Sequence, residues 1–155
     1  MRIGIVGLGL IGGSLAKALK AYTGHEVLVS NRTAATAQAA VAAGDADGLL
    51  TDEALSGAEI VFVCLYPGAT VAYVREKAAL FAKGALVVDC SGVKTPVCEP
   101  LFPVARAHGF VFVGGHPMAG KETSGYAAAE AGLFRGASMI LVPDVDSGIG
   151  KLSRL

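Results

Sequence analysis

MRIGIVGLGLIGGSLAKALK, residues Met1–Lys20, is the stretch that decides the fold. Within it, Arg2–Val6 is a short apolar run typical of a buried strand, and Gly13–Lys20 consists of good helix formers. The pattern G-x-G-x-x-G lies between them. A strand, this glycine pattern and a helix, in that order, are the context that a dinucleotide-binding turn requires, so the sequence predicts a nucleotide-binding α/β domain.

Each glycine of the pattern has a mechanical task. The first allows a tight turn, the second lets the backbone approach a pyrophosphate, and the third lets the helix pack closely on the strand. Unpaired N–H groups at the helix N-terminus then face the phosphates. The alternative is a glycine-rich turn without a ligand. The residues expected to bind a cofactor here are Gly7, Leu8, Gly9, Leu10, Ile11 and Gly12.

The composition is that of one globular domain with a large apolar share. Of the 155 residues, 53% are hydrophobic and 17% are charged, and the mean hydropathy is +0.56. This predicts a readily formed core, together with apolar surface that a second domain or a partner chain covers. The 13 basic and 13 acidic residues balance, and no basic run occurs, so we expect no nucleic-acid partner.

Two uncharged stretches, Ile3–Ala16 and Ile60–Val74, superficially resemble a signal peptide and a membrane span. Five glycines interrupt the first, and Pro67 breaks the second, which is also too short to cross a bilayer. We therefore expect a cytoplasmic protein with no membrane partner. Three cysteines without metal-ligand spacing predict free thiols and no metal site; they are Cys64, Cys90 and Cys98.

Short apolar runs alternate with helical patterns along the chain, which predicts a doubly wound, mostly parallel sheet of the Rossmann type. Strands are expected at 2–6, 26–30, 59–65, 85–89, 110–113 and 137–142, and helices at 10–22, 33–43, 51–55, 69–81 and 95–108, with another helix beginning at 146. Pro100 and Pro103 are expected to bend or shorten the helix over 95–108.

Ligands bind such sheets at the carboxyl ends of the strands, so the loops at those ends should converge on one crevice. These loops are Gly7–Gly12, Ser30–Thr33, Leu65–Gly68, Asp89–Lys94 and Gly114–Gly120. Besides the glycine turn, the residues expected to bind the cofactor are Ser30, Asn31, Arg32, Thr33, Leu65, Tyr66, Pro67, Ser91 and Gly92.

The loop after the second strand indicates which dinucleotide binds. NAD sites of this type place an acidic residue there to accept from the ribose 2′-hydroxyl, but Ser30–Thr33 contains no carboxylate. Arg32 can bind a 2′-phosphate, and Asn31 and Thr33 can donate hydrogen bonds to it. The sequence therefore predicts NADP, with NAD as second choice. The alternative is that Arg32 only covers the adenine ring or is solvated surface.

His116 is the candidate for proton transfer, because a histidine at a strand end points towards the cofactor crevice. The alternative is a structural polar loop, and His25 and His108 are expected at the surface.

Asp89 and Lys94 follow another strand. The simpler interpretations there are that Asp89 caps a turn and that the Lys94 side chain is solvated. The segment 122–135 is expected to be a loop with a short helix that could close over a substrate.

Three segments resemble the prephenate and arogenate dehydrogenases of tyrosine biosynthesis: GLGLIGGSLA at Gly7–Ala16, DCSGVKT at Asp89–Thr95 and GGHPMAGKETSG at Gly114–Gly125. The resemblance implies oxidative decarboxylation of prephenate to 4-hydroxyphenylpyruvate, or of arogenate to tyrosine. It also implies that His116 is the catalytic base, which takes the proton of the substrate hydroxyl as the hydride leaves, and that Glu122 helps to gate the site.

The sequence departs from that family in two ways. Many members have a serine before the Val-Lys pair, hydrogen-bonded to the catalytic histidine. Gly92 occupies that position here, so either Ser91 substitutes or backbone or water orients the histidine. The family also has a helical C-terminal domain that dimerises and supplies an arginine for the substrate carboxylate. With residues 1–142 as the Rossmann domain and 143–155 as the start of the link, we expect this chain to bind nucleotide but to turn over poorly.

Two other interpretations remain at this point. A β-hydroxyacid dehydrogenase or an imine reductase would explain the glycine turn and the Asn-Arg-Thr loop, but not the segment around His116. A nucleotide-sensing Rossmann module would need no catalytic base.

Overall fold

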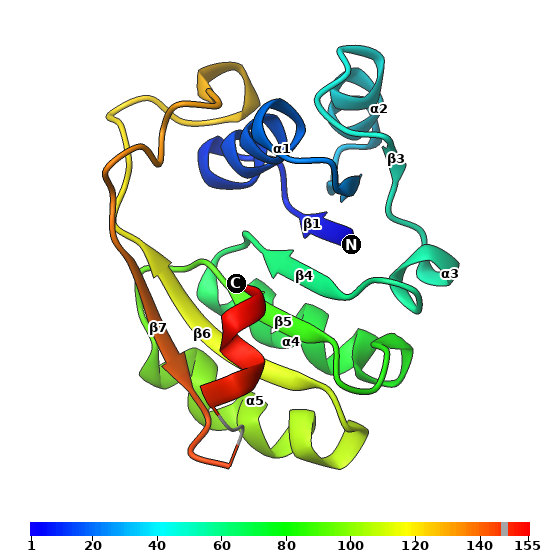
Figure 1. Cartoon of the computed structure of the whole chain (residues 1–155), viewed down its shortest axis with the longest axis vertical. Helices are drawn as coiled ribbons and strands as arrows, with labels where there is room; N and C mark the ends of the chain where they lie inside the picture. Colours follow the sequence, from blue (N-terminus) through cyan, green and yellow to red (C-terminus); the bar gives the residue numbers. More distant parts are fainter. Residues whose placement is uncertain (147–148) are drawn as a thin grey trace.

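The computed structural model describes residues 1–146 and 149–155, and its centre is a seven-stranded sheet in the order β3-β2-β1-β4-β5-β6-β7 (Figure 1). The first six strands run parallel, and the last is antiparallel to its neighbour. The strands are β1 (Arg2–Val6), β2 (Glu26–Ser30), β3 (Gly48–Leu49), β4 (Ile60–Val63), β5 (Leu86–Asp89), β6 (Val111–Pro117) and β7 (Met139–Pro143).

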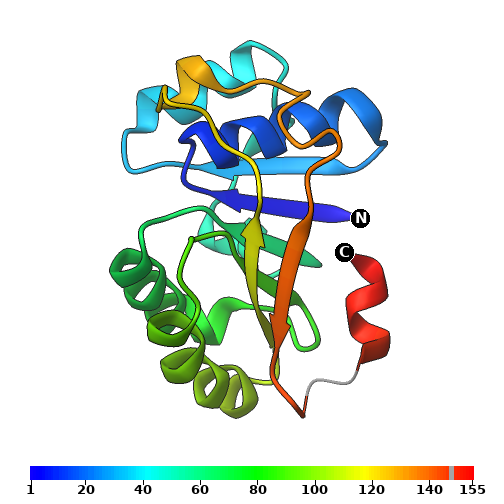
Figure 2. The ribbon, with the colours of Figure 1, turned by 90° about the vertical axis from the view of Figure 1, so that its left-hand side faces the viewer.

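Helices cover both faces of the sheet, as expected for a doubly wound fold (Figures 1 and 2). α1 and α2 pack on one face, and α3, α4 and α5 pack on the other. The helices are α1 (Leu10–Tyr22), α2 (Ala34–Ala42), α3 (Asp52–Leu55), α4 (Pro67–Lys77) and α5 (Thr95–His108), with 3₁₀ turns η1 (Ala78–Leu80), η2 (Tyr126–Ala128) and η3 (Ile149–Arg154).

The central strands form because their side chains are apolar on both faces, as parallel strands between two helical layers must be. Ile5 of β1 pairs with Val29 of β2 on one side and with Phe62 of β4 on the other. Ile5 and Val29 are completely buried. The chain passes outward through β2 and β3 and then returns to the other side of β1, so the strand order reverses between β1 and β4. Ligands bind such sheets at this reversal.

Several elements differ in detail from the sequence-based expectations. The two-residue β3 was not predicted. β7 is the antiparallel strand of a sheet that was expected to be mostly parallel. β6 continues to Pro117, so His116 lies within a paired strand rather than in a loop. α5 is not shortened by Pro100 and Pro103, because its buried side chains, such as Leu101, pack on the sheet and compensate for the lost hydrogen bonds.

The last residues form a 3₁₀ turn, η3, where the start of an α-helix was expected; residues 147 and 148 lie outside the described part of the chain. Leu152 of η3 packs on a sheet face with Ile3, Ile60 and Leu86. β7 ends at Pro143, one residue beyond the expected domain boundary. Among the described residues, none of the helices has both the length and the apolar character needed to cross a membrane.

Candidate active site

The turn between β1 and α1 is tightly packed at two of its three glycines. Gly7 has φ of +90°, and a Cβ there would lie 2.7 Å from the Cys64 carbonyl oxygen. A Cβ on Gly12 would lie 1.9 Å from the Gly7 carbonyl oxygen. The protein itself therefore requires glycine at both positions, as the predicted roles in the turn and in helix–strand packing demand.

Gly9 differs, because a Cβ there would meet no protein atom within 4 Å. Its φ of −85° also suits any residue. Gly9 is the N-cap of α1, and neither a capping side chain nor an acidic residue occupies the first turn of that helix. The turn thus presents unpaired N–H groups and open space to an external anion, and it fits the pyrophosphate of a dinucleotide.

The loop after β2 is joined to the glycine turn by Asn31. Its Oδ1 accepts a hydrogen bond from Leu8 N (2.9 Å), and its Nδ2 donates to the Thr33 carbonyl (3.3 Å). Asn31 therefore holds the loop against the turn. Arg32 is exposed, and no carboxylate pairs with it among the described residues.

A groove of about 860 Å³ runs along the carboxyl ends of the strands. It has the size of a cofactor site. Every residue predicted to bind the cofactor lines it except Gly12, which lies beneath the turn. The structure adds residues that were not predicted: Val6, Cys64, Ala69, Tyr73, Cys90, Ser124 and Gly125. Cys64 and Cys90 directly follow buried strands, which is a signal that could have identified them.

Two of these added residues are neutral side chains in the groove. The hydrogen bond with Cys90, together with burial, raises the pKa of the Cys64 thiol well above its ordinary value. Burial raises the pKa of Tyr73 to about 12. The groove wall next to β4 therefore carries no negative charge from these groups at neutral pH.

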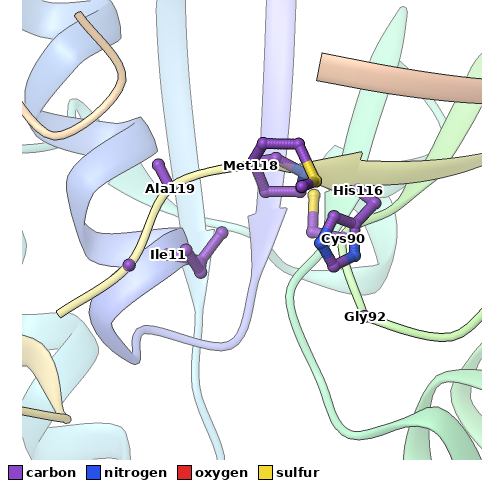
Figure 3. Close-up of a pocket in the computed structure, with 8 residues that line it drawn as sticks. Ile11, Cys90, Gly92, His116, Met118 and Ala119 are labelled. Atoms are coloured by element: carbon purple, nitrogen blue, oxygen red, sulfur yellow. The ribbon is translucent and has the colours of Figure 1, made fainter. Parts of the chain in front are cut away.

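His116 lies in a second pocket of about 360 Å³, which adjoins the groove. Ile11, Cys90 and Gly92 line both spaces. Figure 3 shows His116 and Cys90 on one side of this pocket and Ile11, from the start of α1, on the other. A group held by His116 would thus face a ligand in the groove.

The histidine ring is oriented by a backbone atom. Nδ1 of His116 lies 3.2 Å from the Ser91 carbonyl oxygen. Because a carbonyl only accepts, Nδ1 carries the proton, and Nε2 remains as an acceptor in the neutral ring. Of the alternatives left by the sequence, the structure therefore shows the backbone one. The Ser91 hydroxyl lies 3.1 Å from Asp89 Oδ2 and 3.1 Å from the Val93 carbonyl, and does not contact His116.

Asp89 and Lys94 form an ion pair behind this loop. Asp89 is completely buried, and its Oδ1 accepts from Ser91 N (2.9 Å), so the expected turn cap is confirmed. Lys94 is not the solvated side chain of the simpler interpretation. Its side chain is 18% exposed, and its Nζ donates to both Asp89 and the Gly115 carbonyl.

Glu122 lies apart from these groups. It is exposed and lines neither the groove nor the pocket, although Gly120 and Ser124 on either side of it do. A role for Glu122 in gating stays a prediction.

No cationic side chain lines the His116 pocket among the described residues. The arginines of the second half are engaged elsewhere: Arg106 pairs with Asp144, Arg135 donates to the Tyr22 hydroxyl, and Arg154 pairs with Glu59.

The comparisons with known proteins agree with this geometry. The family model described as the prephenate dehydrogenase nucleotide-binding domain matches residues 15–155. The cyclohexadienyl dehydrogenase of Zymomonas mobilis is 34% identical over 146 residues, which are 92% of this chain and 49% of that protein. The chain thus spans about half the length of this relative.

Solved structures of relatives superpose closely on the chain. The arogenate dehydrogenase of Synechocystis has a TM-score of 0.91 at 32% identity, covering 99% of this chain and 54% of that one. The prephenate dehydrogenase of Aquifex aeolicus, in complex with hydroxyphenyl propionate and NAD⁺, has a TM-score of 0.82 at 27% identity, covering 99% and 54%. The chain therefore belongs to the prephenate dehydrogenase family and corresponds to its nucleotide-binding domain.

Proposed function

We propose that this chain binds NADP in its groove and serves an enzyme that oxidatively decarboxylates prephenate to 4-hydroxyphenylpyruvate, with arogenate as the alternative substrate. His116 is the general base of this reaction. The observation that carries the proposal is the position of His116, whose ring is fixed through Nδ1 on a wall that the pocket shares with the groove.

The chemistry assigned to the chain is one proton transfer. Nε2 of His116 accepts the proton of the substrate ring hydroxyl, because Nδ1 already donates to the Ser91 carbonyl. Negative charge that accumulates on the hydroxyl oxygen assists the departure of the hydride from the ring carbon. A nicotinamide dinucleotide supplies the hydride acceptor when bound. Carbon dioxide then leaves, and the ring becomes aromatic.

The test is the absorbance of NADPH formed from NADP and either prephenate or arogenate, by a protein that carries this domain together with the helical domain expected of the family. We expect signal with one of the two substrates. His116→Asn should lower kcat by about 100-fold or more with an unchanged Kd for NADPH, whereas exposed His108→Asn should change neither. No signal with either substrate, despite NADPH binding, would contradict the proposal and favour a nucleotide-sensing module.

The preference for NADP rests on the loop after β2. Arg32 is exposed at the groove without a carboxylate partner among the described residues, and it is available to a 2′-phosphate. We expect Arg32→Gln to weaken NADPH binding by roughly 10- to 100-fold, as for the loss of a charge-assisted hydrogen bond, and to leave NADH binding unchanged. Exposed Arg75→Gln on α4 is the control. Equal losses for both nucleotides, or tighter NADH binding by the unchanged chain, would contradict the preference.

The remaining proposals concern the protein around this domain. We propose that residues 1–142 form the nucleotide-binding domain and that 143–155 begin the link to a helical domain, through which the protein forms homodimers in the cytoplasm. Support comes from β7, where Met139 and Ile140 expose apolar side chains that a covering domain would bury.

A further inference from the structure

The ion pair between Asp89 and Lys94 joins two neighbouring strands next to His116. Asp89 ends β5, and Lys94 immediately precedes α5. Lys94 Nζ donates to Asp89 Oδ2 and also to the carbonyl of Gly115, the residue before His116 on β6. One ammonium group therefore holds the end of β5 and the backbone beside the histidine at the same time.

The other side of the Asp89 carboxylate holds the loop that contacts the ring. Its Oδ1 accepts from Ser91 N at 2.9 Å, and its Oδ2 lies 3.1 Å from the Ser91 hydroxyl. The Ser91 carbonyl in turn accepts from His116 Nδ1 at 3.2 Å. These contacts form a closed ring of interactions that runs from Lys94 to Asp89, Ser91, His116 and Gly115, and back to Lys94.

Two glycines of β6 leave the space that this ring of interactions needs. A Cβ on Gly114 would lie 3.1 Å from Lys94 Cδ and 2.4 Å from Cys98 Sγ. A Cβ on Gly115 would lie 2.4 Å from the Asp89 carbonyl oxygen. The paired glycines before His116 thus admit the Lys94 stem and the end of β5, rather than a ligand.

We propose that Asp89 and Lys94 are positioning residues that hold His116 in the tautomer with the proton on Nδ1. They act through the Ser91 carbonyl and the Gly115 backbone and do not touch the substrate. The ion pair thereby keeps Nε2 unprotonated in the neutral ring and ready to accept a proton. The inference rests on the proposed role of His116 as the base, although the tautomer itself can be observed without turnover.

The test is ¹⁵N–¹H NMR of the histidine rings in the 155-residue chain, at about pH 9, where histidine side chains are ordinarily neutral. Two-bond correlations distinguish a proton on Nδ1 from one on Nε2. We expect His116 to show only the Nδ1 pattern. Lys94→Met should convert it to a mixture of the two tautomers, while His25 and His108 in the same spectrum stay unchanged.

Removing Lys94 alone leaves a buried carboxylate without its partner, which can unfold the chain. The double variant Asp89→Asn with Lys94→Met removes both charges, and its amide spectrum reports whether the fold is kept. It should also show mixed tautomers at His116. The matched control is Lys20→Met. It removes a partly exposed ion pair with Asp47, which lies near the start of β2 and away from His116, so the Nδ1 pattern should be retained.

Two results would overturn the inference: a mixture of tautomers at His116 in the unchanged chain, or a pure Nδ1 pattern in the folded double variant. Neither depends on activity. Absence of turnover with prephenate and arogenate would instead overturn the proposed function and leave the tautomer result standing.

Discussion

Gly9 and Gly12 lie three residues apart in one turn, yet a side chain would meet opposite surroundings at the two positions. At Gly12 a Cβ would overlap the Gly7 carbonyl oxygen, at 1.9 Å. At Gly9 it would meet no protein atom within 4 Å. The same residue type is thus required by the protein's packing at one position and, on our proposal, by a ligand at the other.

This contrast gives a paired prediction. Gly12→Ala should lower the free energy of unfolding by about 3 kcal/mol or more, since backbone must move to admit the methyl group. Gly9→Ala should change it by less than about 1 kcal/mol and weaken NADPH binding at least tenfold. Urea unfolding and NADPH titration measure the two effects. A folded Gly9→Ala variant with unchanged NADPH affinity would contradict the assignment of the turn to the pyrophosphate.

Single residues also show which contacts could not be predicted from the sequence. The sequence does not show what Gly114 and Gly115 lie against, and the structure identifies these neighbours as the Lys94 stem and the end of β5. The sequence left open which group orients His116, because the Ser91 carbonyl is a backbone atom, and every residue has one. Contacts of this kind depend on the register between β5 and β6, which no local pattern encodes.

At the scale of elements, the segment between β6 and β7 returns over α1 and forms part of the groove (Figure 2). Gly13 admits it, because a Cβ there would lie 2.8 Å from the Ala129 side chain. Tyr126 donates a hydrogen bond to Asp45. Burial, this hydrogen bond and the charge of Asp45 all raise the pKa of Tyr126, so the hydroxyl remains a donor at neutral pH.

Tyr126→Phe should therefore loosen this segment without unfolding the sheet. Loss of one hydrogen bond worth about 1 kcal/mol predicts about fivefold faster amide exchange over residues 124–130. Because Ser124 and Gly125 line the groove, NADPH should also dissociate several-fold faster. Hydrogen exchange and stopped-flow fluorescence measure the two rates. The control is Ser56→Ala, which removes an exposed hydrogen bond to the Glu53 carbonyl at the end of α3, away from this segment. Unchanged exchange over 124–130 would show that Tyr126 does not anchor the segment.

The sequence predicted the elements whose pattern is local. The strands β1, β2, β4, β5 and β6 are short, strongly apolar runs, and Thr51 caps α3 as its residue type indicates. The antiparallel direction of β7 is set by the path of the chain over α1, and the apolar run at 139–143 does not indicate it. β3 has only two residues and shows no periodicity at all.

At the scale of the whole molecule, the reversal of strand order between β1 and β4 brings four loops around one groove. Those loops follow β1, β2, β4 and β5, so a dinucleotide bound there contacts both halves of the sheet. The His116 pocket depends on a smaller set, with β5, β6 and the start of α1, and among the described residues no cation lines it. The described residues thus include all the loops expected to contact a dinucleotide, whereas none of them places a cation in the pocket for the carboxylates of the proposed substrate.

This asymmetry predicts how the 155-residue chain responds to its two ligands. NADPH at 100 times its Kd should raise the free energy of unfolding by about 2.7 kcal/mol, since it binds only the folded state. Prephenate or arogenate, with or without NADPH, should add no further stability, and NADP reduction should be slow or undetectable. Urea unfolding with each ligand and the NADPH absorbance assay measure these outcomes. Stabilisation by prephenate alone, or turnover at the rate of a full-length relative, would show that the pocket is sufficient and that a cation from the proposed helical domain is not needed.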